Sequence, residues 1–599
     1  MVDSASRKYS HARPLIHFTA PSWINDPCAP GYDQSTGIYH LFYQCNPYGC
    51  EWGNMSWGHA ISTDLLNWTR RRDPALRPDQ PYDTDGVFTG CMAPPDIKDD
   101  GILAVVYSSV RKLPFHWSTP PYPRNAAGVS LAISLDSGKT WEKLRENPVL
   151  LGEPDDIKVT GFRDPFIAKW PSADWLLGRA EEKLYGLVSG GVDTSGPTAF
   201  LYEVQPCDLT KWKYLGPLVD LPLNFQPSKN WSGNYGINWE CVNFLSFQAG
   251  SIFKHFLLLG AEGDIERDHI ETYDLPSCLS PRTVRSQLWM SGDLINNEGS
   301  IKLQYRQGGY LDHGSFYAAN SFKDPMSGRY IVHGWIPEED ITPEHARQKG
   351  WKGSLALPRE VFLLTIPAVV KALRSPLHDI SGIETETRPD GAYDVYTLGV
   401  RPISEVDRFR NNCRKVHETN GHLLLPQSTQ QRRRWLYSTI SSTWELEATI
   451  SLSSSCDTVG FYIRHNDDLS VSTAITFSSL AENITIDRAA SNDAPNINRC
   501  AESGPFTLFT TMNYANDRRD EAELKPEALH LRILSDGDVL EVFANSRFAL
   551  ATMVYSNFKT GAHGGITAFA TGEPNSAAFE CVKIWDGLNG EKSIVNDES

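Results

Sequence analysis

A phrase that ends in tryptophan occurs three times in the first half of this chain of 599 residues. It stands at Ser62–Trp68, Ser134–Trp141 and Pro206–Trp212, so the tryptophans lie about 72 residues apart. A repeat of that length, holding about four strands, is too long for one turn of a solenoid and fits one blade of a β-propeller. A first region of roughly 360 residues then provides five blades.

Short runs rich in Val, Ile, Leu, Phe and Tyr occur throughout the same region, each bounded by Gly, Pro, Asp or Asn. Helical periodicity over a dozen residues is nearly absent, so these runs predict strands joined by tight turns and an all-β fold. The runs lie at Ile38–Tyr43, Leu103–Tyr107, Leu184–Val188, Phe256–Leu259 and Tyr330–Trp335.

The sequence pattern changes near residue 366. Residues 367–390 contain prolines and no regular pattern, which predicts a connector packed on the surface. Residues 391–599 contain alternating β segments, with Asp536-Gly537 as a hairpin turn, and these predict a β-sandwich that is structural or forms a side wall of the site. The predicted strands are Trp444–Leu452, Thr458–Arg464, Thr473–Phe477, Ile484–Arg488, Phe506–Met512, Leu529–Leu534, Val539–Phe543 and Gly565–Phe569. We therefore expect a five-bladed propeller over residues 1–366 and a sandwich over 391–599.

The formal net charge of −17 argues against nucleic acid or an anionic membrane as the main partner, because an acidic surface is repelled by both. A neutral ligand is the better expectation. Aromatic residues make up 11% of the chain, including 17 Trp, and such rings pack against the C–H faces of sugars while their polar edges meet hydroxyls.

The N-terminal residues Met1–Lys8 lack the apolar run of a secretory signal, and no later stretch reaches the length of a membrane span. We expect a cytoplasmic protein, or a secreted one if a signal was removed before this sequence begins. The 11 Cys are odd in number and scattered, which favours reduced thiols, although Cys45 and Cys50 are close enough to form a bridge. Glycosylation-type triplets, relevant only in a secreted chain, begin at Asn54, Asn67, Asn230 and Asn483.

Three acidic residues stand in distinctive surroundings. Asp26 lies in Trp-Ile-Asn-Asp-Pro-Cys, Asp164 follows an arginine and precedes a proline, and Glu240 lies between a tryptophan and a cysteine. Asn-Asp-Pro is also ordinary turn chemistry, so Asp26 alone indicates little. However, Asp26 and Asp164 are about two repeats apart, and Asp164 and Glu240 about one. All three can therefore occupy equivalent strands around one channel.

In its motifs and in their order along the sequence, the chain resembles glycoside hydrolase family 32, the invertases, inulinases and fungal fructosyltransferases that act on β-fructofuranosides. The likeness covers nearly the whole chain and implies the fold of that family, a five-bladed propeller followed by a sandwich. The motifs that carry it are Trp23–Pro27, Phe42–Pro47, Trp57–Ala60, Phe88–Gly90, Arg163–Pro165, Glu240-Cys241, Asp312–Ala318, Leu357–Glu360 and Leu540–Asn545.

The resemblance implies a retaining mechanism, in which one carboxylate attacks the anomeric carbon and a second carboxyl serves as acid and then base. By resemblance Asp26 attacks, Glu240 is the acid/base, and Asp164 binds fructose hydroxyls as charge develops on the ring. Arg163 is expected to hold these carboxylates in place and to bind hydroxyls.

Further positions match residues that line the fructose pocket in that family. For one of them, Phe88, packing in the hydrophobic core is an equally good interpretation. These positions are Asn25, Gln44, Trp52, Phe88 and Thr89. Asp312 and His313 either reach the leaving-group side or make structural hydrogen bonds.

The nucleophile motif continues with Cys28 where the hydrolases of the family usually have Asn-Gly, and this continuation is similar to that of fungal fructosyltransferases. A thiol in place of an amide beside the nucleophile can leave water less well positioned, so that a sugar acceptor competes better. We therefore expect transfer of fructose from sucrose to sucrose or fructo-oligosaccharides to be favoured over hydrolysis. Neither a cofactor nor a metal is expected, because histidines are dispersed and neither His-Glu-x-x-His nor a glycine-rich phosphate loop occurs.

Three other interpretations stay open at this point. A plain intracellular invertase differs from a transferase in releasing as much fructose as glucose. An inverting arabinan-cleaving propeller also carries two aspartates and a glutamate, but needs its carboxyls roughly 6.5–9.5 Å apart rather than about 5–5.5 Å. A non-catalytic sugar-binding propeller would keep its function after Asp26→Ala.

Overall fold

The computed structural model describes residues 12–94, 101–116, 118–249, 252–263, 279, 282–419, 421, 423, 425, 431–514, 522–556 and 564–589. Strands make up most of its regular structure, so the predicted all-β class is confirmed. The helical elements in the described residues are short: α2 (Pro171–Leu176), α4 (Pro343–Lys349), η2 (Leu377–Asp379) and η3 (Ser404–Asn412). Among the described residues no helix has the length and apolar character needed to cross a membrane.

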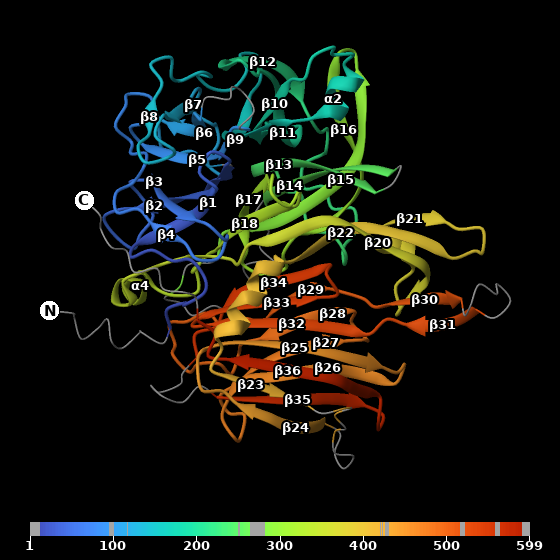
Figure 1. Ribbon diagram of the computed structural model, residues 1–599. Helices are drawn as coiled ribbons and strands as arrows, with labels where there is room; N and C mark the ends of the chain where they lie inside the picture. Colours follow the sequence, from blue (N-terminus) through green and yellow to red (C-terminus); the bar gives the residue numbers. More distant parts are fainter. Residues whose placement is uncertain are drawn as a thin grey trace.

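The first half of the chain forms four sheets in succession, each with four antiparallel strands in chain order (Figure 1). The first sheet contains β1 (Trp23–Asp33), β2 (Ile38–Asn46), β3 (Ser56–Ser62) and β4 (Thr69–Arg70). The second contains β5 (Gly86–Met92), β6 (Leu103–Val110), β7 (Ala127–Ser134) and β8 (Glu142–Lys143). The third contains β9 (Val159–Lys169), β10 (Leu184–Val192), β11 (Gly196–Gln205) and β12 (Asp208–Pro217). The fourth contains β13 (Asn238–Ala249), β14 (Ile252–Glu262), β15 (Arg285–Asn297) and β16 (Ser300–Tyr310).

A fifth sheet follows and is larger. Its main path runs through β17 (Tyr317–Lys323), β18 (Tyr330–Ile336), β20 (Arg359–Ala372), β22 (Tyr393–Pro402) and β21 (Glu384–Thr387), with β19 (Ser354–Leu355) paired to β18. The first strands of the five sheets contact one another in a closed circuit, from β1 through β5, β9, β13 and β17 back to β1. Residues far apart in sequence are thereby brought to one place.

The strand predictions for the first half are confirmed, and each of the five predicted runs is the second strand of its sheet: β2, β6, β10, β14 and β18. The repeated tryptophan phrase lies where the third strand passes into the fourth. Its aspartate accepts backbone N–H groups of the turn, as Asp64 does from Leu66 at 3.0 Å and Asp136 from Lys139 at 3.0 Å. The repeat is therefore a turn that stops one strand and starts the next.

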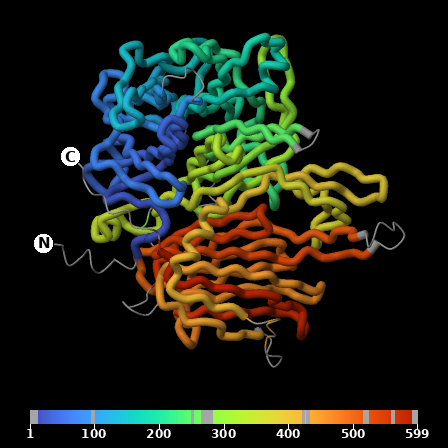
Figure 2. Tube along the Cα trace, in the orientation of Figure 1, coloured from blue at the N-terminus to red at the C-terminus, as the bar shows by residue number. Residues whose placement is uncertain are grey.

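The second half of the chain forms two six-stranded sheets that share one hydrophobic core. One sheet has the order β23 (Lys415–Glu418), β36 (Ala577–Asp586), β25 (Thr443–Leu452), β32 (Leu529–Asp536), β33 (Val539–Ala544) and β34 (Phe548–Met553). The other has the order β24 (Gln431–Ser438), β35 (Gly565–Gly572), β26 (Cys456–His465), β27 (Thr473–Ser478), β28 (Asn483–Asp487) and β29 (Glu502–Pro505). The alternating burial along β27 and β28 is that of strands with one face in the core. In both Figure 1 and Figure 2 these orange and red strands form a block below the earlier sheets.

Two predictions for this part of the chain differ from the structure. The predicted strand Phe506–Met512 begins later, as β30 (Phe509–Tyr514), and pairs with β20 and with β31 (Ala522–Pro526) rather than within the sandwich sheets. The predicted connector 367–390 contains the end of β20 and all of β21, because those residues pair with β30 and β22. These strands extend to the right in Figure 1. Where one domain ends and the next begins stays a prediction.

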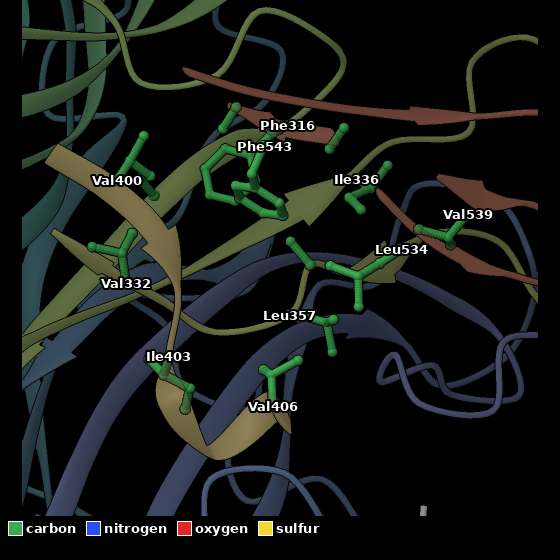
Figure 3. Packing of buried hydrophobic residues seen from close by; sticks show 14 of the residues in the cluster. Phe316, Val332, Ile336, Leu357, Val400, Ile403, Val406, Leu534, Val539 and Phe543 are labelled. Carbon is green, nitrogen blue, oxygen red and sulfur yellow. The ribbon is translucent and has the colours of Figure 1, made fainter. Parts of the chain in front are cut away.

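A hydrophobic cluster joins the fifth sheet to the sandwich (Figure 3). Val332 lies in β18 of the fifth sheet, and Phe316 immediately precedes β17. Leu534, Val539 and Phe543 come from the β32–β33 hairpin. All of these side chains are buried, so the two halves of the chain pack as one continuous core at this junction.

Arg359 lies fully buried in the same junction and carries an ion pair to each half. Its Nη1 is 2.8 Å from Asp312 Oδ2, and its Nη2 is 2.9 Å from Glu541 Oε1. Both carboxylates have fully buried side chains, so the guanidinium balances negative charge in a low-dielectric interior.

We expect Arg359→Met to lower the free energy of unfolding by about 3–5 kcal/mol, because buried Asp312 loses its charged partner and buried Glu541 keeps only His17. Chemical denaturation followed by tryptophan fluorescence measures the change. Arg401→Met is the matched control: Arg401 pairs with Glu360 at 3.0 Å, but its side chain is half exposed. The control should shift the free energy by at most about 0.5 kcal/mol. Equal losses in the two variants would contradict this interpretation.

Candidate active site

The first strand of each of the five sheets contains a β-bulge at an equivalent place, where one extra residue stands relative to the partner strand. The register breaks fall between Ile24 and Pro27, Phe88 and Gly90, Arg163 and Phe166, Glu240 and Asn243, and Tyr317 and Asn320. A bulge bends its strand and redirects the side chains beside it. Because the five first strands contact one another, the redirected side chains are expected to meet.

Several residues at these bulges have left-handed backbone conformations. Asp164 has φ = 59°, Cys241 has φ = 50° and Ala318 has φ = 55°, although none of them is glycine. Such conformations are uncommon for L-residues and persist only where the surroundings enforce them. The strain is thus concentrated at the same point of three neighbouring first strands.

The structure brings the three acids of the sequence prediction into one site. The Sγ atom of Cys241 lies 3.8 Å from Asp26 Oδ2 and 3.7 Å from Asp164 Oδ2, so a single thiol contacts both aspartates. The backbone N–H of Cys241 also donates to Asp164 Oδ2 at 3.2 Å. Glu240 precedes this cysteine on β13, and its side chain is 22% exposed.

Asp26 is held by a network of polar side chains. The hydroxyl of Thr89 donates to Asp26 Oδ2 at 2.5 Å, and Asn25 Nδ2 lies 3.3 Å from Asp26 Oδ1. Gln44 joins these two supports, since its Oε1 accepts from Asn25 at 3.0 Å and its Nε2 donates to Thr89 at 2.6 Å. Gln44 and Thr89 are buried. These residues therefore fix the carboxylate of Asp26 as well as lining its surroundings.

Glu240 is held on both of its carboxylate oxygens. Arg163 Nε donates to Oε1 at 2.8 Å, and the Tyr317 hydroxyl donates to Oε2 at 2.8 Å. The same guanidinium contacts Glu262 Oε2 through Nη2 at 2.9 Å. Gly260 pairs with Glu240 across β13 and β14, and a Cβ at that glycine would lie 2.6 Å from the Tyr317 hydroxyl oxygen. The absence of a side chain at residue 260 leaves room for the tyrosine.

Burial and mutual repulsion raise the proton affinity of the aspartates. Burial and the charge of Glu240 raise the pKa of Asp26 to about 6, against the opposing effects of the Thr89 hydrogen bond, Arg285 and Arg163. Burial also raises the pKa of Asp164 well above its usual range, and the nearby Arg163 offsets only part of that effect. The site therefore changes its charge in the mildly acidic range.

Aromatic rings lead from the surface toward Arg163. Trp52 is 52% exposed and meets Phe88 edge to face with ring centroids 6.2 Å apart. Phe88 lies 6.0 Å from Phe115, and the guanidinium carbon of Arg163 lies 5.6 Å from the Phe115 centroid. Partly exposed rings beside carboxylates offer the apolar faces and polar neighbours that a sugar ring requires.

Two models of known families match this chain. The N-terminal domain model of glycosyl hydrolases family 32 matches residues 17–371, and the C-terminal model of the same family matches residues 405–586. The chain belongs to glycosyl hydrolase family 32. The resemblance inferred from the motifs is thereby confirmed at the level of the family.

Named relatives of this family 32 chain come from plants and fungi. A curated β-fructofuranosidase, insoluble isoenzyme 3, from Oryza sativa subsp. indica is 31% identical over 387 residues, which span 60% of this chain and 56% of that protein. A solved Aspergillus kawachii β-fructofuranosidase is 28% identical with a TM-score of 0.82, covering 97% of this chain and 95% of that one. A solved fructosyltransferase from A. japonicus is 26% identical with a TM-score of 0.84, covering 97% and 96%. The alignment spans just over half of the rice protein.

Asp312 and His313 make structural contacts in this family 32 fold, which is one of the two alternatives expected for them, whereas Cys28 lies beside Asp26. Asp312 is buried against Arg359 and accepts the backbone N–H of Ala551 at 3.1 Å. His313 is stacked on Phe548 of the sandwich, with centroids 4.6 Å apart. Both residues therefore serve the junction between the two halves of the chain. Cys28 is fully buried, and its thiol donates to the backbone oxygen of Asp26 at 3.4 Å.

Tyr317, Arg285 and Glu262 had no predicted role. Tyr317 donates to Glu240, Glu262 pairs with Arg163, and the charge of Arg285 favours the ionised form of Asp26. A signal for Tyr317 was present, since Tyr317-Ala318 occupies in β17 the place that Glu240-Cys241 occupies in β13. Cys45 and Cys50, which are close enough in sequence to form a bridge, are free thiols. No group of three His, Cys, Asp or Glu among the described residues is arranged to hold a metal ion.

We expect Thr89→Val to shift the acid limb of the pH–rate profile for glycoside cleavage to higher pH. The hydroxyl of Thr89 stabilises the ionised form of Asp26, so its loss raises a pKa that already lies at about 6. Thr89→Ser keeps the hydroxyl and should restore the original limb. The measurement is kcat/KM against pH for the three proteins. If the acid limb is unchanged in Thr89→Val, ionisation of Asp26 does not produce that limb.

Proposed function

We propose that this chain is a retaining enzyme that cleaves β-fructofuranosides and takes sucrose as its fructosyl donor. The observation that carries the proposal is the convergence of Asp26, Asp164 and Glu240 in a family 32 chain. Asp26 and Asp164 share contacts with one thiol, and Glu240 is held by Arg163 beside them. A pair of carboxyl groups with different environments is the equipment that glycoside cleavage needs.

We also propose that the five sheets of the first half are the blades of one propeller and that the site lies where their first strands meet. The closed circuit of contacts among β1, β5, β9, β13 and β17 supports this arrangement. Closure of the circuit also protects the first strands from pairing with other chains.

In the proposed first step a carboxylate oxygen of Asp26 attacks C2 of the fructosyl unit and forms an ester bond. The bond from C2 to the glucosyl oxygen breaks, and Glu240 gives its proton to that oxygen. In the second step Glu240 takes the proton of an acceptor hydroxyl, whose oxygen attacks C2 and releases Asp26. Asp164 is proposed to bind fructose hydroxyls throughout, and Arg163 orients the Glu240 carboxyl through its 2.8 Å hydrogen bond.

Transfer to a sugar acceptor is proposed to exceed hydrolysis. Similarity to the A. japonicus fructosyltransferase supports transfer, whereas similarity to the rice and A. kawachii β-fructofuranosidases supports the alternative of sucrose hydrolysis. Because Cys28 is fully buried, its influence on the acceptor is proposed to be indirect, through the position of Asp26, to whose backbone oxygen its thiol donates. Direct contact between Cys28 and the acceptor is not part of the proposal.

A time course of products from concentrated sucrose tests this function. We expect free glucose to exceed free fructose from the earliest times, with the missing fructose in trisaccharides and longer chains. Asp26→Asn and Glu240→Gln keep the shape of the site but should lower kcat by at least about 10³-fold, because each removes a group that reacts. Equal release of glucose and fructose would favour the invertase alternative, and an inactive wild-type chain would refute the proposal.

The configuration of the first product separates retention from inversion. NMR spectra taken during early turnover should show fructosyl products with the β configuration of the donor. An inverted first product would instead favour the mechanism of the arabinan-cleaving propellers. Sugar binding without turnover, unchanged in Asp26→Ala, would favour a binding protein.

A further inference from the structure

Arg285 contacts two aromatic rings beside the proposed catalytic groups. It is the first residue of β15, and its guanidinium carbon is 4.8 Å from the Tyr317 ring centroid and 4.9 Å from the Trp335 centroid. Its Nη2 is 2.8 Å from Glu339 Oε1, and its side chain is 16% exposed. A cation held by two ring faces and one carboxylate has a fixed orientation.

One of these rings supports the acid/base side of the site. Tyr317 donates its hydroxyl proton to Glu240 Oε2 at 2.8 Å. Burial and the charge of Glu240 raise the pKa of Tyr317 well above its ordinary value, so the hydroxyl stays protonated and remains a donor. The position of this ring therefore sets where one oxygen of Glu240 lies.

The other ring supports the nucleophile side. Trp335 meets Trp23 edge to face, with centroids 5.8 Å apart. The indole Nε1 of Trp23 donates to Asn25 Oδ1 at 3.3 Å, and Asn25 Nδ2 in turn lies 3.3 Å from Asp26 Oδ1. A short series of contacts thus runs from Trp335 to the carboxylate of Asp26.

We propose that Arg285 is a positioning residue for both reacting carboxyl groups, acting on Glu240 through Tyr317 and on Asp26 through Trp335 and its own positive charge. Both rings contact the same guanidinium, and Tyr317 and Trp335 are paired across β17 and β18, so a change at residue 285 reaches both rings and the two carboxyl groups that they support. The inference rests on the proposed function, since it assigns reacting roles to Asp26 and Glu240.

The charge of Arg285 provides a readout that packing alone does not. The charged groups that influence Asp26 are Glu240 and Asp164, which disfavour its ionised form, and Arg163 and Arg285, which favour it. The buried thiols of Cys28 and Cys241 are also close, and burial keeps their pKa values raised, so they stay neutral. Removal of Arg285 therefore raises the pKa of Asp26 further, and the acid limb of activity moves to higher pH.

Three variants separate the stacking, the charge and the hydrogen bond. Arg285→Met removes both charge and guanidinium plane: kcat should fall about ten- to hundredfold, and the acid limb should move to higher pH. Arg285→Lys keeps the charge but not the plane, so kcat should fall while the acid limb stays near that of the wild type. Tyr317→Phe keeps the ring but not the donor, so kcat should fall while the acid limb stays near that of the wild type.

The experiment measures kcat and KM for sucrose across pH, with thermal unfolding of each variant as a check of folding. Arg306→Met is the matched control, because Arg306 pairs with Asp293 at 2.7 Å on the surface, with its side chain 56% exposed. This control should leave kcat, KM and both limbs unchanged. A well-folded Arg285→Met with the wild-type kcat and the wild-type acid limb would overturn the inference.

Failure of the proposed function has a different signature. A wild-type chain that does not cleave sucrose refutes that function before any variant is compared. An active wild type whose acid limb moves equally in Arg285→Met and Arg285→Lys would refute the role of the charge. If the methionine and lysine variants both keep the wild-type kcat, positioning through the rings is refuted.

Discussion

One extra residue in the first strand of each sheet is the constraint on which the site depends. Regular strands alternate their side chains between two faces, so neighbouring positions such as Asn25 and Asp26 would point in opposite directions. The bulge between Ile24 and Pro27 removes that restriction, and both side chains join one hydrogen-bond network. Similar bulges at Asp164 and Cys241 bring their polar groups to the same place. The geometry of the site thus comes from a local irregularity repeated around a circuit of strands.

The electrostatics of the site follow from placing three carboxyl groups close to two buried guanidinium groups. Burial disfavours ionisation of Asp26 and Asp164, and Arg163 and Arg285 oppose this effect. Arg163 itself forms ion pairs with Glu240 and Glu262, so one positive charge stabilises more than one carboxylate. Such a cluster holds one or more protons near the pH range in which a carboxyl can act as an acid.

The sequence was informative where local chemistry decides the structure. Apolar runs such as Ile38–Tyr43 identified the second strand of each sheet, because these strands are buried on both faces. The repeated phrase was recognisable because an aspartate accepts turn N–H groups wherever it occurs, as Asp64 does. The three acids were recognised by their neighbouring residues and fitted the spacing of the repeat, and the structure places them together.

Features that depend on distant contacts could not be predicted in this way. Tyr317 occupies the repeat position of Glu240, but its hydrogen bond to Glu240 depends on the neighbouring sheet, and Arg285 carries no local signal for the two rings that it contacts. His313 stood in a motif of the family yet stacks on Phe548 more than two hundred residues away. The predicted strand Phe506–Met512 was displaced because its pairing partner, β20, belongs to the other half of the chain.

The most direct test of the central claim is to trap the fructosyl-enzyme. Glu240→Gln incubated with β-fructofuranosyl fluoride should form the ester, because fluoride leaves without an acid, but should not release it, because the base is missing. Mass spectrometry of the digested protein should then find one anhydrofructose unit on the peptide that contains Asp26. Fluoride release with no labelled peptide, or with the label on Asp164, would contradict attack by Asp26.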